Sequence, residues 1–387
     1  MGSGKYSKKT RPNRRTFGKI EAHLTQELQQ VKWAEYSCSE LFQVVSGSKI
    51  KNKSELPEIG NYPVYSSDNN GVVGYTDMPT YICDESRKFY VVFGDHTRTF
   101  NIATKSFSIL DNVKVLKPLQ RISLRQLLFI ISSWKKEIPD LGYARHWKIA
   151  KEVKLSLPIK PDANLDKLAQ IDFDFMENFI SQLEAFRLSQ LEAYLLVTGL
   201  KDYTLTAAEQ QALADFENGK VVWGEYRFAD IFNKIQQGRR LKKDDQVAGD
   251  IPFVMAGITN TGVVNYISNP VASFPKNSIT IDIFGNAFYR SYDFGAGDDT
   301  GVYWNDKKEL SKEMMLFLTK SAEKALEGKF SYGKKLRSSQ SLNFKMQLPT
   351  SNQQPDYGFM QTLISAVQKL MIKDVVNYSS DKMAKTE

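Results

Sequence analysis

The sequence contains few of the residues that form disulfides, metal centres or nucleophilic active sites. Its 387 residues include two cysteines, Cys38 and Cys83, and three histidines, and no set of them has a metal-ligand spacing. No Ser/His/Asp set and no carboxylate cluster followed by a lysine suggests a hydrolase or nuclease site. We therefore expect no disulfide framework and no bound metal, and we interpret both cysteines as small buried apolar residues.

Long hydrophobic runs are also missing. The longest ones, such as residues 127–131, are far shorter than a bilayer span, and the polar N-terminus has no apolar signal-peptide core. These absences predict a cytoplasmic protein.

The basic charge of the chain is unevenly distributed. The net charge is +8, but residues 1–19 hold seven lysines and arginines and no acid, which leaves 8 − 7 = +1 for the remainder. The charge therefore does not mark the body of the chain as a nucleic-acid-binding protein. The basic tail either contacts phosphate or is simply solvated, and the sequence leaves both interpretations open.

The chain does contain one long internal repeat. Residues 30–47, QVKWAEYSCSELFQVVSG, match residues 220–238, KVVWGEYRFADIFNKIQQG, so that Trp33 corresponds to Trp223. Further matches follow in the same order: Phe-Gly at 93–94 with 284–285, 143–159 with 332–350, and 173–186 with 356–370. A period of about 190 residues is far longer than the roughly 20 to 50 of solenoid arrays, so each copy should be a domain.

Each copy combines short alternating runs, typical of β-strands, with segments of helical period. We expect helices at 20–31, 124–134, 173–196, 206–216, 312–326 and 356–376, and strands that include 148–159, 278–284 and one ending at Pro349. The predicted fold class is α+β, with two similar mostly-β domains joined by two long antiparallel helices in a pseudo-twofold circular repeat. The expected boundaries are 1–32 for the basic tail and short helix, 33–160 and 223–350 for the β domains, and 161–222 and 351–387 for the helical spacers.

The two long helices admit two interpretations. Each has an apolar 3-4-3 rhythm, which suits either packing on its own domain or pairing along a coiled-coil seam, and we favour pairing. In the centre of the chain a long helix is followed by a short helix and then by a tryptophan. The C-terminus contains only the long helix, and the N-terminus contains only the short helix and the tryptophan. We therefore expect the terminal segments to meet in space.

One glycine-rich segment suggests an enzyme. Residues 292–297, YDFGAG, resemble the loop with which adenine methyltransferases hold S-adenosylmethionine, but the chain has no Asn/Asp-Pro-Pro-aromatic motif and the first repeat lacks the glycine pair. An ordinary loop is the simpler interpretation. A standalone methyltransferase or nuclease fragment that uses the Gly295 loop stays an alternative, as does a bilobed β protein that binds a ligand other than DNA.

Polar side chains in the predicted loops suit the recognition of base edges. Arginine and lysine match guanine acceptors, asparagine matches adenine, and threonine methyls contact thymine. Each residue alone is more typical of an ordinary surface position, but the loops differ between the repeats more than the framework does, as expected if one scaffold serves two targets. The candidate DNA-binding residues are Lys49, Asn69, Asn70, His96, Thr97, Arg98, Lys105, Arg145 and His146 in the first copy, and Arg239, Arg240, Thr259, Asn260, Asn286, Arg290, Lys334, Lys335 and Arg337 in the second.

The order of β domain, long helix, β domain and long helix resembles the DNA specificity subunit of type I restriction-modification enzymes. Residues 143–159, 175–184 and 279–299 resemble more closely the BcgI-like specificity subunits of type IIB systems, and the likeness covers the chain except the basic tail. The resemblance implies that each β domain reads one half of a split DNA sequence and that the subunit has no catalytic activity or cofactor of its own. It also implies that the helices bind a methyltransferase or nuclease-methyltransferase partner, which carries S-adenosylmethionine; the helix residues we assign to this contact are Phe179, Leu183, Phe186, Leu363, Val367 and Leu370.

The length of the first long helix agrees with a split target. A helix over residues 172–195 would span about 36 Å at 1.5 Å per residue, close to the roughly 34 Å of one duplex turn. The helix length agrees with recognition of two short half-sequences separated by an unread spacer. The resemblance implies in addition that the protein directs adenine methylation and cleavage by its partners.

Overall fold

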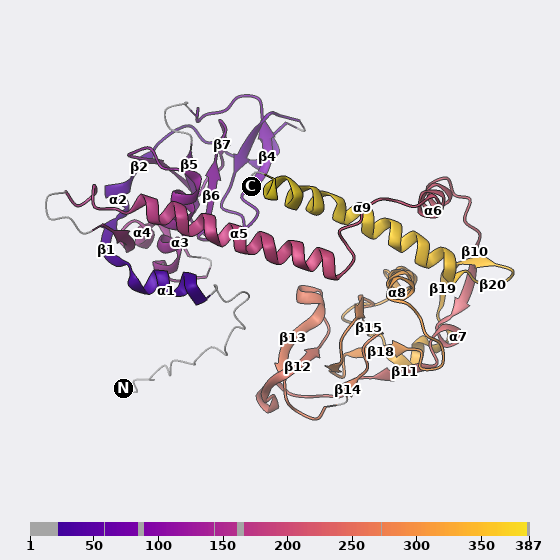
Figure 1. Ribbon diagram of the computed structural model, residues 1–387. Coiled ribbons are helices and arrows are strands. Elements are labelled where there is room, and N and C mark those ends of the chain that lie inside the picture. The colour runs from indigo at the N-terminus through magenta and orange to yellow at the C-terminus, as the bar shows by residue number, and fades with distance from the viewer. Residues whose placement is uncertain are drawn as a thin grey trace. The chain divides into compact units, whose positions relative to one another are not determined.

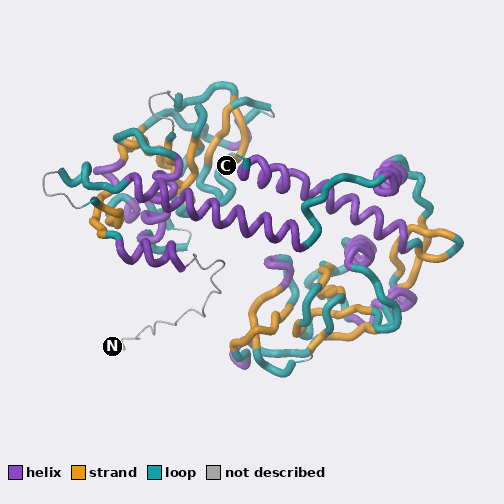
Figure 2. Tube along the Cα trace, in the orientation of Figure 1, coloured by secondary structure: helices purple, strands orange, loops and turns teal. Residues whose placement is uncertain are grey.

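A computed structural model describes residues 22–57, 59–83, 89–142, 144–160, 166–271 and 273–384. The basic tail and the phosphate contact considered for it lie outside the described residues. The chain divides into two compact units, Met1–Gln190 and Leu191–Glu387, and each is treated by itself (Figure 1). Both units mix helices, strands and long loops (Figure 2).

The first unit contains one complete copy of the repeat. Its elements are α1 (Ala22–Gln30), β1 (Lys32–Ser37), α2 (Cys38–Leu41), β2 (Phe42–Val45), η1 (Lys53–Glu55), β3 (Tyr62–Tyr65), β4 (Val72–Thr76), β5 (Tyr90–Gly94), β6 (Thr99–Ala103), β7 (Ser108–Ile109), β8 (Val113–Pro118), α3 (Leu124–Glu137), α4 (Trp147–Ala150), β9 (Lys154–Ile159) and α5 (Phe173–Val197). The helix α5 crosses the boundary, so its residues from Leu191 onward belong to the second unit.

The sheet β2-β8-β5-β6 lies at the centre of the first unit because both of its faces are buried. Val91 and Phe93 of β5 point into the core shared with α3 and α5, whereas Val92 points into a second core shared with the sheet β4-β3-β7. Trp134 of α3 stacks on Phe42 at 5.7 Å between ring centroids and donates its indole N–H to a backbone carbonyl, so its polar edge is satisfied in the core.

The second unit repeats this plan. Its elements are α6 (Ala207–Glu217), β10 (Trp223–Arg227), α7 (Phe228–Ile231), β11 (Lys234–Gln237), η2 (Lys243–Asp245), β12 (Ala248–Val254), η3 (Thr259–Gly262), β13 (Val263–Ile267), β14 (Ser273–Phe274), β15 (Ser278–Asp282), β16 (Ala287–Arg290), β17 (Phe294–Ala296), β18 (Thr300–Trp304), α8 (Lys312–Leu326), η4 (Ser338–Asn343), β19 (Lys345–Ser351), β20 (Gln354–Pro355) and α9 (Tyr357–Met383). The sheet β11-β18-β15-β16 takes the place of β2-β8-β5-β6, with α8 and α9 against one face.

Strand pairing confirms the internal repeat. Trp33 of β1 lies opposite Pro158 of β9, and Trp223 of β10 lies opposite Pro349 of β19. The Phe-Gly pairs, however, are not equivalent, because Phe93 and Gly94 end strand β5 whereas residues 284–285 lie in the turn between β15 and β16.

Most of the expected helices are found at nearly the predicted bounds. α8 coincides with the predicted helix, whereas α9 continues seven residues beyond 376, to Met383. The predicted strand 148–159 begins only at Lys154, because the short helix α4 takes up its start. The predicted strand 278–284 stops at Asp282, where a turn with Gly285 at a φ of 92° reverses the chain. None of the helices in the described ranges meets the length and hydropathy of a membrane span.

In each unit a short helix packs on a long one. Leu24 of α1 shares a core with Phe179 of α5, and in the second unit Lys369 of α9 pairs with Glu209 of α6 at 2.8 Å. The order of these elements confirms a circular repeat, with the short helix before each β domain and the long helix after it. Both long helices thus pack on their own β domains, and their pairing with one another, like the meeting of the termini, stays a prediction.

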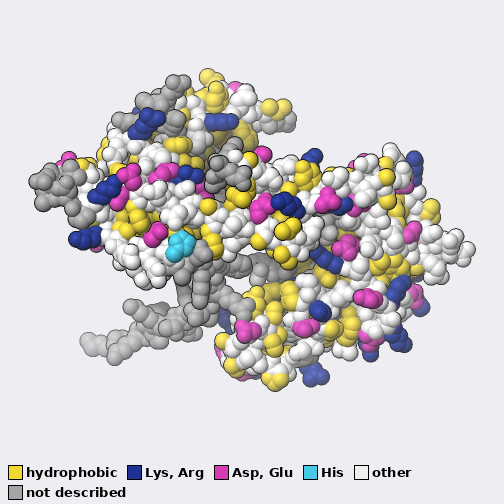
Figure 3. All heavy atoms as spheres, viewed as in Figure 1, with side chains coloured by type: hydrophobic (Ala, Val, Ile, Leu, Met, Phe, Trp, Pro, Cys, Tyr) yellow, Lys and Arg dark blue, Asp and Glu magenta, His cyan; other side chains and the backbone are white. Residues whose placement is uncertain are grey.

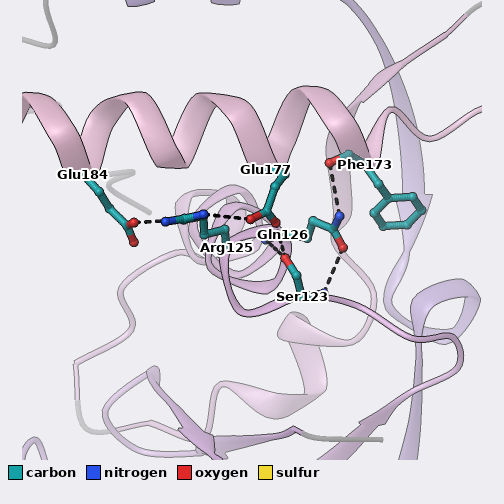
Figure 4. Close-up of polar contacts among 6 residues, drawn as sticks. All are labelled: Ser123, Arg125, Gln126, Phe173, Glu177 and Glu184. Atoms are coloured by element: carbon teal, nitrogen blue, oxygen red, sulfur yellow. Dashed lines mark hydrogen bonds and ion pairs between the residues drawn. The ribbon is translucent and has the colours of Figure 1, made fainter. Parts of the chain in front are cut away.

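The first β domain is attached to α5 by a polar cluster at the start of α3 (Figure 4). Arg125 forms ion pairs with Glu177 at 3.1 Å and Glu184 at 2.9 Å, both on one face of α5. Ser123 caps α3, and its hydroxyl donates to the Glu177 carboxylate while Gln126 reaches the backbone carbonyl of Phe173. These contacts fix the orientation of the domain on the first turns of the helix.

Candidate DNA interface

Five loops of the first unit meet at one end of its central sheet, and we call this region the first loop end. Its described residues are 46–50, 66–71, 95–98, 110–112, 138–142 and 144–146. Thr97 donates its hydroxyl proton to the carbonyl of Ser67 at 2.7 Å, and the amides of Asp95 and His146 bond to neighbouring loops at 3.0 and 2.9 Å. Hydrogen bonds between loops therefore hold this end together without regular structure.

Several predicted residues of the first copy are exposed there. Asn69 and Asn70 project at the tip of the loop between β3 and β4, and Arg145 is exposed beside them in the same loop end. Lys49 pairs with Asp111 at 2.9 Å, and this bond, reinforced by the charge of Arg145, lowers the pKa of the Asp111 carboxyl.

His96 and Thr97 are half-buried in the turn between β5 and β6. Both residues bond to Ser67 in the neighbouring loop. The backbone amide of His96 donates to the Ser67 hydroxyl at 2.8 Å, and the Thr97 hydroxyl donates to the Ser67 carbonyl. Neither side chain is fully exposed at this end of the sheet.

One predicted contact of the first copy needs correction, and two others have surroundings that differ from a loop tip. His146 is 1% exposed, and its Nε2 accepts the Leu141 amide proton while Nδ1 donates to the carbonyl of Asp95, so the ring supports the loop end from inside. Arg98 is half-buried and bonds to Asp140 at 2.8 Å. Lys105 follows β6 at the opposite end of the sheet, because β6 runs antiparallel to β5.

The second unit builds the equivalent region, the second loop end, from residues 238–242, 255–262, 283–286, 297–299 and 331–338. Asp282, at the end of β15, is its organising residue. Its buried carboxylate accepts the backbone N–H of Gly257 at 3.1 Å, and those of Phe284 and Asn286. One side chain thus connects the turn after β15 to the loop after β12.

The exposed charged residues of the second loop end are basic. Arg239 and Arg240 follow β11, Thr259 and Asn260 form the tip of the loop after β12, and the segment before η4 is attached through Arg337, which donates to the carbonyl of Asp298 at 2.8 Å. Lys334 and Lys335 are exposed on the same segment. In the described ranges no carboxylate forms an ion pair with any of these five cations.

Two predicted residues of the second copy have structural contacts. Asn286 is half-buried and donates its side-chain amide to Asp282 at 2.9 Å. Arg290 is 1% exposed, so the expectation that it contacts a base directly is corrected, because its guanidinium is fully surrounded by protein.

The sequence did not reveal the residues that hold the loops in place. Asp95 and Asp282 follow or end the central strand of each sheet, and both are buried at 4% exposure. Acidic residues at the ends of apolar strands, at 91–95 and 279–282, are the sequence signal that could have identified them. The basic loop residues were the predicted ones because their chemistry matches DNA.

Basic and acidic side chains are interspersed over the drawn face of both units (Figure 3). Positive charge is therefore a property of individual loops, above all of the second loop end.

The glycine-rich segment is not a cofactor loop. Residues 294–296 form strand β17, which pairs with β12 and β14 and is buried. A β-carbon placed on Gly295 would lie 3.2 Å from the ring of Phe253, so no space remains for a ligand. This packing removes the methyltransferase interpretation that depended on Gly295. The described residues also contain no group of three or more His, Cys, Asp or Glu side chains that could hold a metal ion.

Two similar α+β units, each presenting polar and basic loops at one end of a buried sheet, define a two-domain recognition protein. The chain belongs to the family of the type I restriction modification DNA specificity domain, which matches residues 30–193 and 220–378. It is 24% identical over 366 residues to the type II restriction enzyme specificity subunit S.BcgI of Heyndrickxia coagulans. The match covers 91% of this chain and 99% of that protein.

A solved structure shows the same fold. The type I restriction-modification S subunit from M. genitalium matches with a TM-score of 0.53 and 14% identity, over 92% of this chain and 93% of that one. The chain is therefore a specificity subunit with two specificity domains, and recognition of DNA sequence is the function of its family. Such subunits are the non-catalytic members of restriction-modification systems, in agreement with the expectation from the sequence.

Proposed function

We propose that this chain reads a bipartite DNA sequence, one half with the first loop end and the other half with the second. The observation that carries the proposal is the duplication of one loop arrangement on two equivalent sheets, with different side chains at equivalent positions. Because the loops rather than the strands differ, the two ends should prefer different bases.

The chemistry of the two ends supports different recognition. The first presents the amides of Asn69 and Asn70, which suit the paired donor and acceptor of adenine. The second combines Thr259 and Asn260 with several exposed cations, which suit guanine acceptors and phosphate oxygens. We infer that the second loop end supplies more of the salt-dependent affinity, since its cations are not neutralised by described carboxylates.

We further propose that the long helices bind a methyltransferase or nuclease-methyltransferase subunit that carries S-adenosylmethionine and performs adenine methylation and cleavage. The protein would then act in the cytoplasm, where its DNA target is located. The relative from Heyndrickxia coagulans is itself a specificity subunit of a type II restriction enzyme.

The predicted partner-binding residues are not equally accessible. Phe179 and Leu363 are buried in the cores of their own units, at 5% and 4% exposure, so they shape the helices rather than offer a surface. Leu183, Phe186 and Val367 are half-buried, and Leu370 is 49% exposed. Beside Leu370, α9 also exposes Met371 and Tyr378, at 78% and 57%. Burial of such side chains by a partner is favourable by about 25 cal/mol per Å² of apolar surface.

Selection from a pool of random duplexes tests the proposal. The full chain, alone and with a co-expressed methyltransferase, should enrich two short conserved half-sequences separated by a spacer of fixed length and random composition. Enrichment of one continuous sequence, or of none in either condition, would contradict it.

A matched pair of variants assigns the halves. Asn69→Ala with Asn70→Ala should weaken the base preference in one half only, and Thr259→Ala with Asn260→Ala should weaken it in the other. All four residues are exposed loop-tip positions, and three of them should change stability little. Asn260→Ala places an alanine at a φ of 49° and loses the bond to the Val263 carbonyl, so a melting curve is recorded for that variant. Loss of preference in both halves from either pair would show that the loop ends do not read independently.

A further inference from the structure

Arg290 is a buried cation under the second loop end. Its Nε donates to the Thr280 hydroxyl at 3.0 Å, and its Nη1 donates to the hydroxyls of Thr261 and Tyr292 at 3.1 and 3.3 Å. Nη2 donates to the backbone carbonyl of Thr261, and the guanidinium lies 5.5 Å from the ring centroid of Phe288. No described carboxylate pairs with it, and desolvation lowers the pKa of its guanidinium.

The loop that Arg290 holds has an unusual backbone. Asn260 and Thr261 have φ angles of 49° and 52°, and Gly262 follows at 83°, so three consecutive residues are in the left-handed region. For residues other than glycine this conformation costs roughly 1–3 kcal/mol each, and it persists only where surrounding contacts impose it. Arg290 contributes both a hydroxyl contact and a carbonyl contact to Thr261, at the centre of this segment.

We propose that Arg290 is a positioning residue for DNA specificity, which holds residues 260–262 in the left-handed conformation that presents Thr259 and Asn260 at the tip. The proposal rests on the proposed function, since it assigns to Arg290 the shape of a loop that reads DNA. Arg290 itself does not touch the bases. Its role is to connect strand β15, through Thr280, to the loop.

An arginine is required for this arrangement. The planar guanidinium directs separate N–H groups at Thr280 on one side and Thr261 on the other, whereas a lysine ammonium is a single point charge at the end of a flexible chain. Lysine would also bury its charge with fewer partners. We therefore expect Arg290→Lys to behave much like Arg290→Met.

Among the described residues of the first unit, the position that corresponds to Arg290 in the strand pairing is an alanine. In the second unit, Arg290 of β16 lies opposite Ser278, the first residue of the central strand β15. In the first unit, Ala103 of β6 lies opposite Tyr90, the first residue of the central strand β5. The loop over this face contains Gly71 at a φ of 72°, and a β-carbon there would lie 2.3 Å from the side chain of Asn101. Gly71 directly precedes β4 as Gly262 directly precedes β13, but Asn69 and Asn70 have no positive φ, so the first loop does not have the left-handed Asn-Thr pair that Arg290 holds in the second. The effect of Arg290 should be confined to one half-site.

Selection from random duplexes with the full chain and its co-expressed methyltransferase provides the test. Arg290→Met and Arg290→Lys should each reduce base preference in the half assigned to Thr259 and Asn260 by about tenfold or more at a read position, the scale of one lost base contact. The other half-sequence should be unchanged. Circular dichroism and a melting curve, recorded at the same time, establish that the second unit is folded at the assay temperature.

Three outcomes would overturn the proposal: unchanged preference in both halves, equal loss in both halves, or full recovery by lysine. Absence of sequence preference in the unsubstituted protein is a different result, since it refutes the proposed function and the role of Arg290 with it.

A second variant separates positioning from simple stabilisation. Thr261→Gly adopts the left-handed conformation without strain and keeps the carbonyl that Arg290 binds, but it lacks the hydroxyl. If Arg290 acts through this residue, the losses of preference caused by Arg290→Met and Thr261→Gly should be less than additive. Additive losses would show that Arg290 affects the half-site by another route.

Discussion

The attachment of α6 to α9 depends on one buried carboxylate, Glu209, which is 6% exposed. It accepts bonds from Lys369 at 2.8 Å, from the Ser365 hydroxyl at 2.6 Å and from the Thr206 amide at 2.8 Å. Burial alone raises the pKa of this carboxyl, but these bonds, first that from Lys369, outweigh it and hold the pKa at about 2. We predict that Glu209→Ala destabilises the second unit substantially.

The magnitude follows from the lowered pKa. The difference between the ordinary 4.5 and about 2 corresponds to about 3 kcal/mol, at roughly 1.4 kcal/mol per pH unit. Because the folded-state pKa is lowered, this stabilisation is fully present above pH 4.5 and is lost as the pH falls towards 2. Removal of one member of a buried ion pair costs roughly 3–5 kcal/mol, which is the same scale as the value worked out from the pKa of Glu209.

Urea unfolding of the full chain at neutral pH, and at steps from pH 4.5 to 2.5, measures the effect. The control is Glu27→Ala in the first unit, where the Glu27 carboxylate accepts an exposed 3.5 Å bond from Gln182 of α5; the cost of this substitution should stay below about 0.5 kcal/mol. The double variant Glu209→Ala with Lys369→Met should lose less unfolding free energy than the sum of the losses in the two single variants. A loss below about 1 kcal/mol for Glu209→Ala, or an unchanged acid dependence, would refute the reasoning.

Three further predictions concern the loops and the long helix. Arg239→Ala removes an unpaired surface cation of the second loop end and should reduce the slope of log binding constant against log salt by about 1, as a titration across salt concentrations would show; an unchanged slope would remove Arg239 from the phosphate contacts. Gly262→Ala places a β-carbon 2.7 Å from the carbonyl oxygen of Met255 and should cost at least about 1–3 kcal/mol in urea unfolding, whereas Gly142→Ala, with nothing within 4 Å, should cost less. Insertion of seven residues within 181–195 lengthens the helix by about 10 Å and should lengthen the preferred spacer without changing either half-sequence; an unaltered spacer would contradict the idea that the helix sets the spacing.

Local sequence patterns were sufficient for the order of the longer helices and of the repeated strands that carry tryptophan. The helical pattern of residues 312–326 gave the bounds of α8, and the tryptophans at 33 and 223 marked equivalent edge strands. Short dipeptide matches were less informative, as the Phe-Gly pairs show, because two residues can recur by chance at different points of a turn.

The sequence by itself determined the twofold repeat and the family, because hydrophobic period and repeated motifs are local properties of the chain. Only the tertiary structure decided which polar residues are available to DNA. Arg145 and His146 are neighbours, yet one is exposed and the other is buried against Asp95. Arg290 and Lys334 were equivalent candidates, yet one is enclosed beneath Thr261 while the other is at the surface. The physical reason is that burial depends on partners far away in the chain, which bring the loops together only when both sheets have formed.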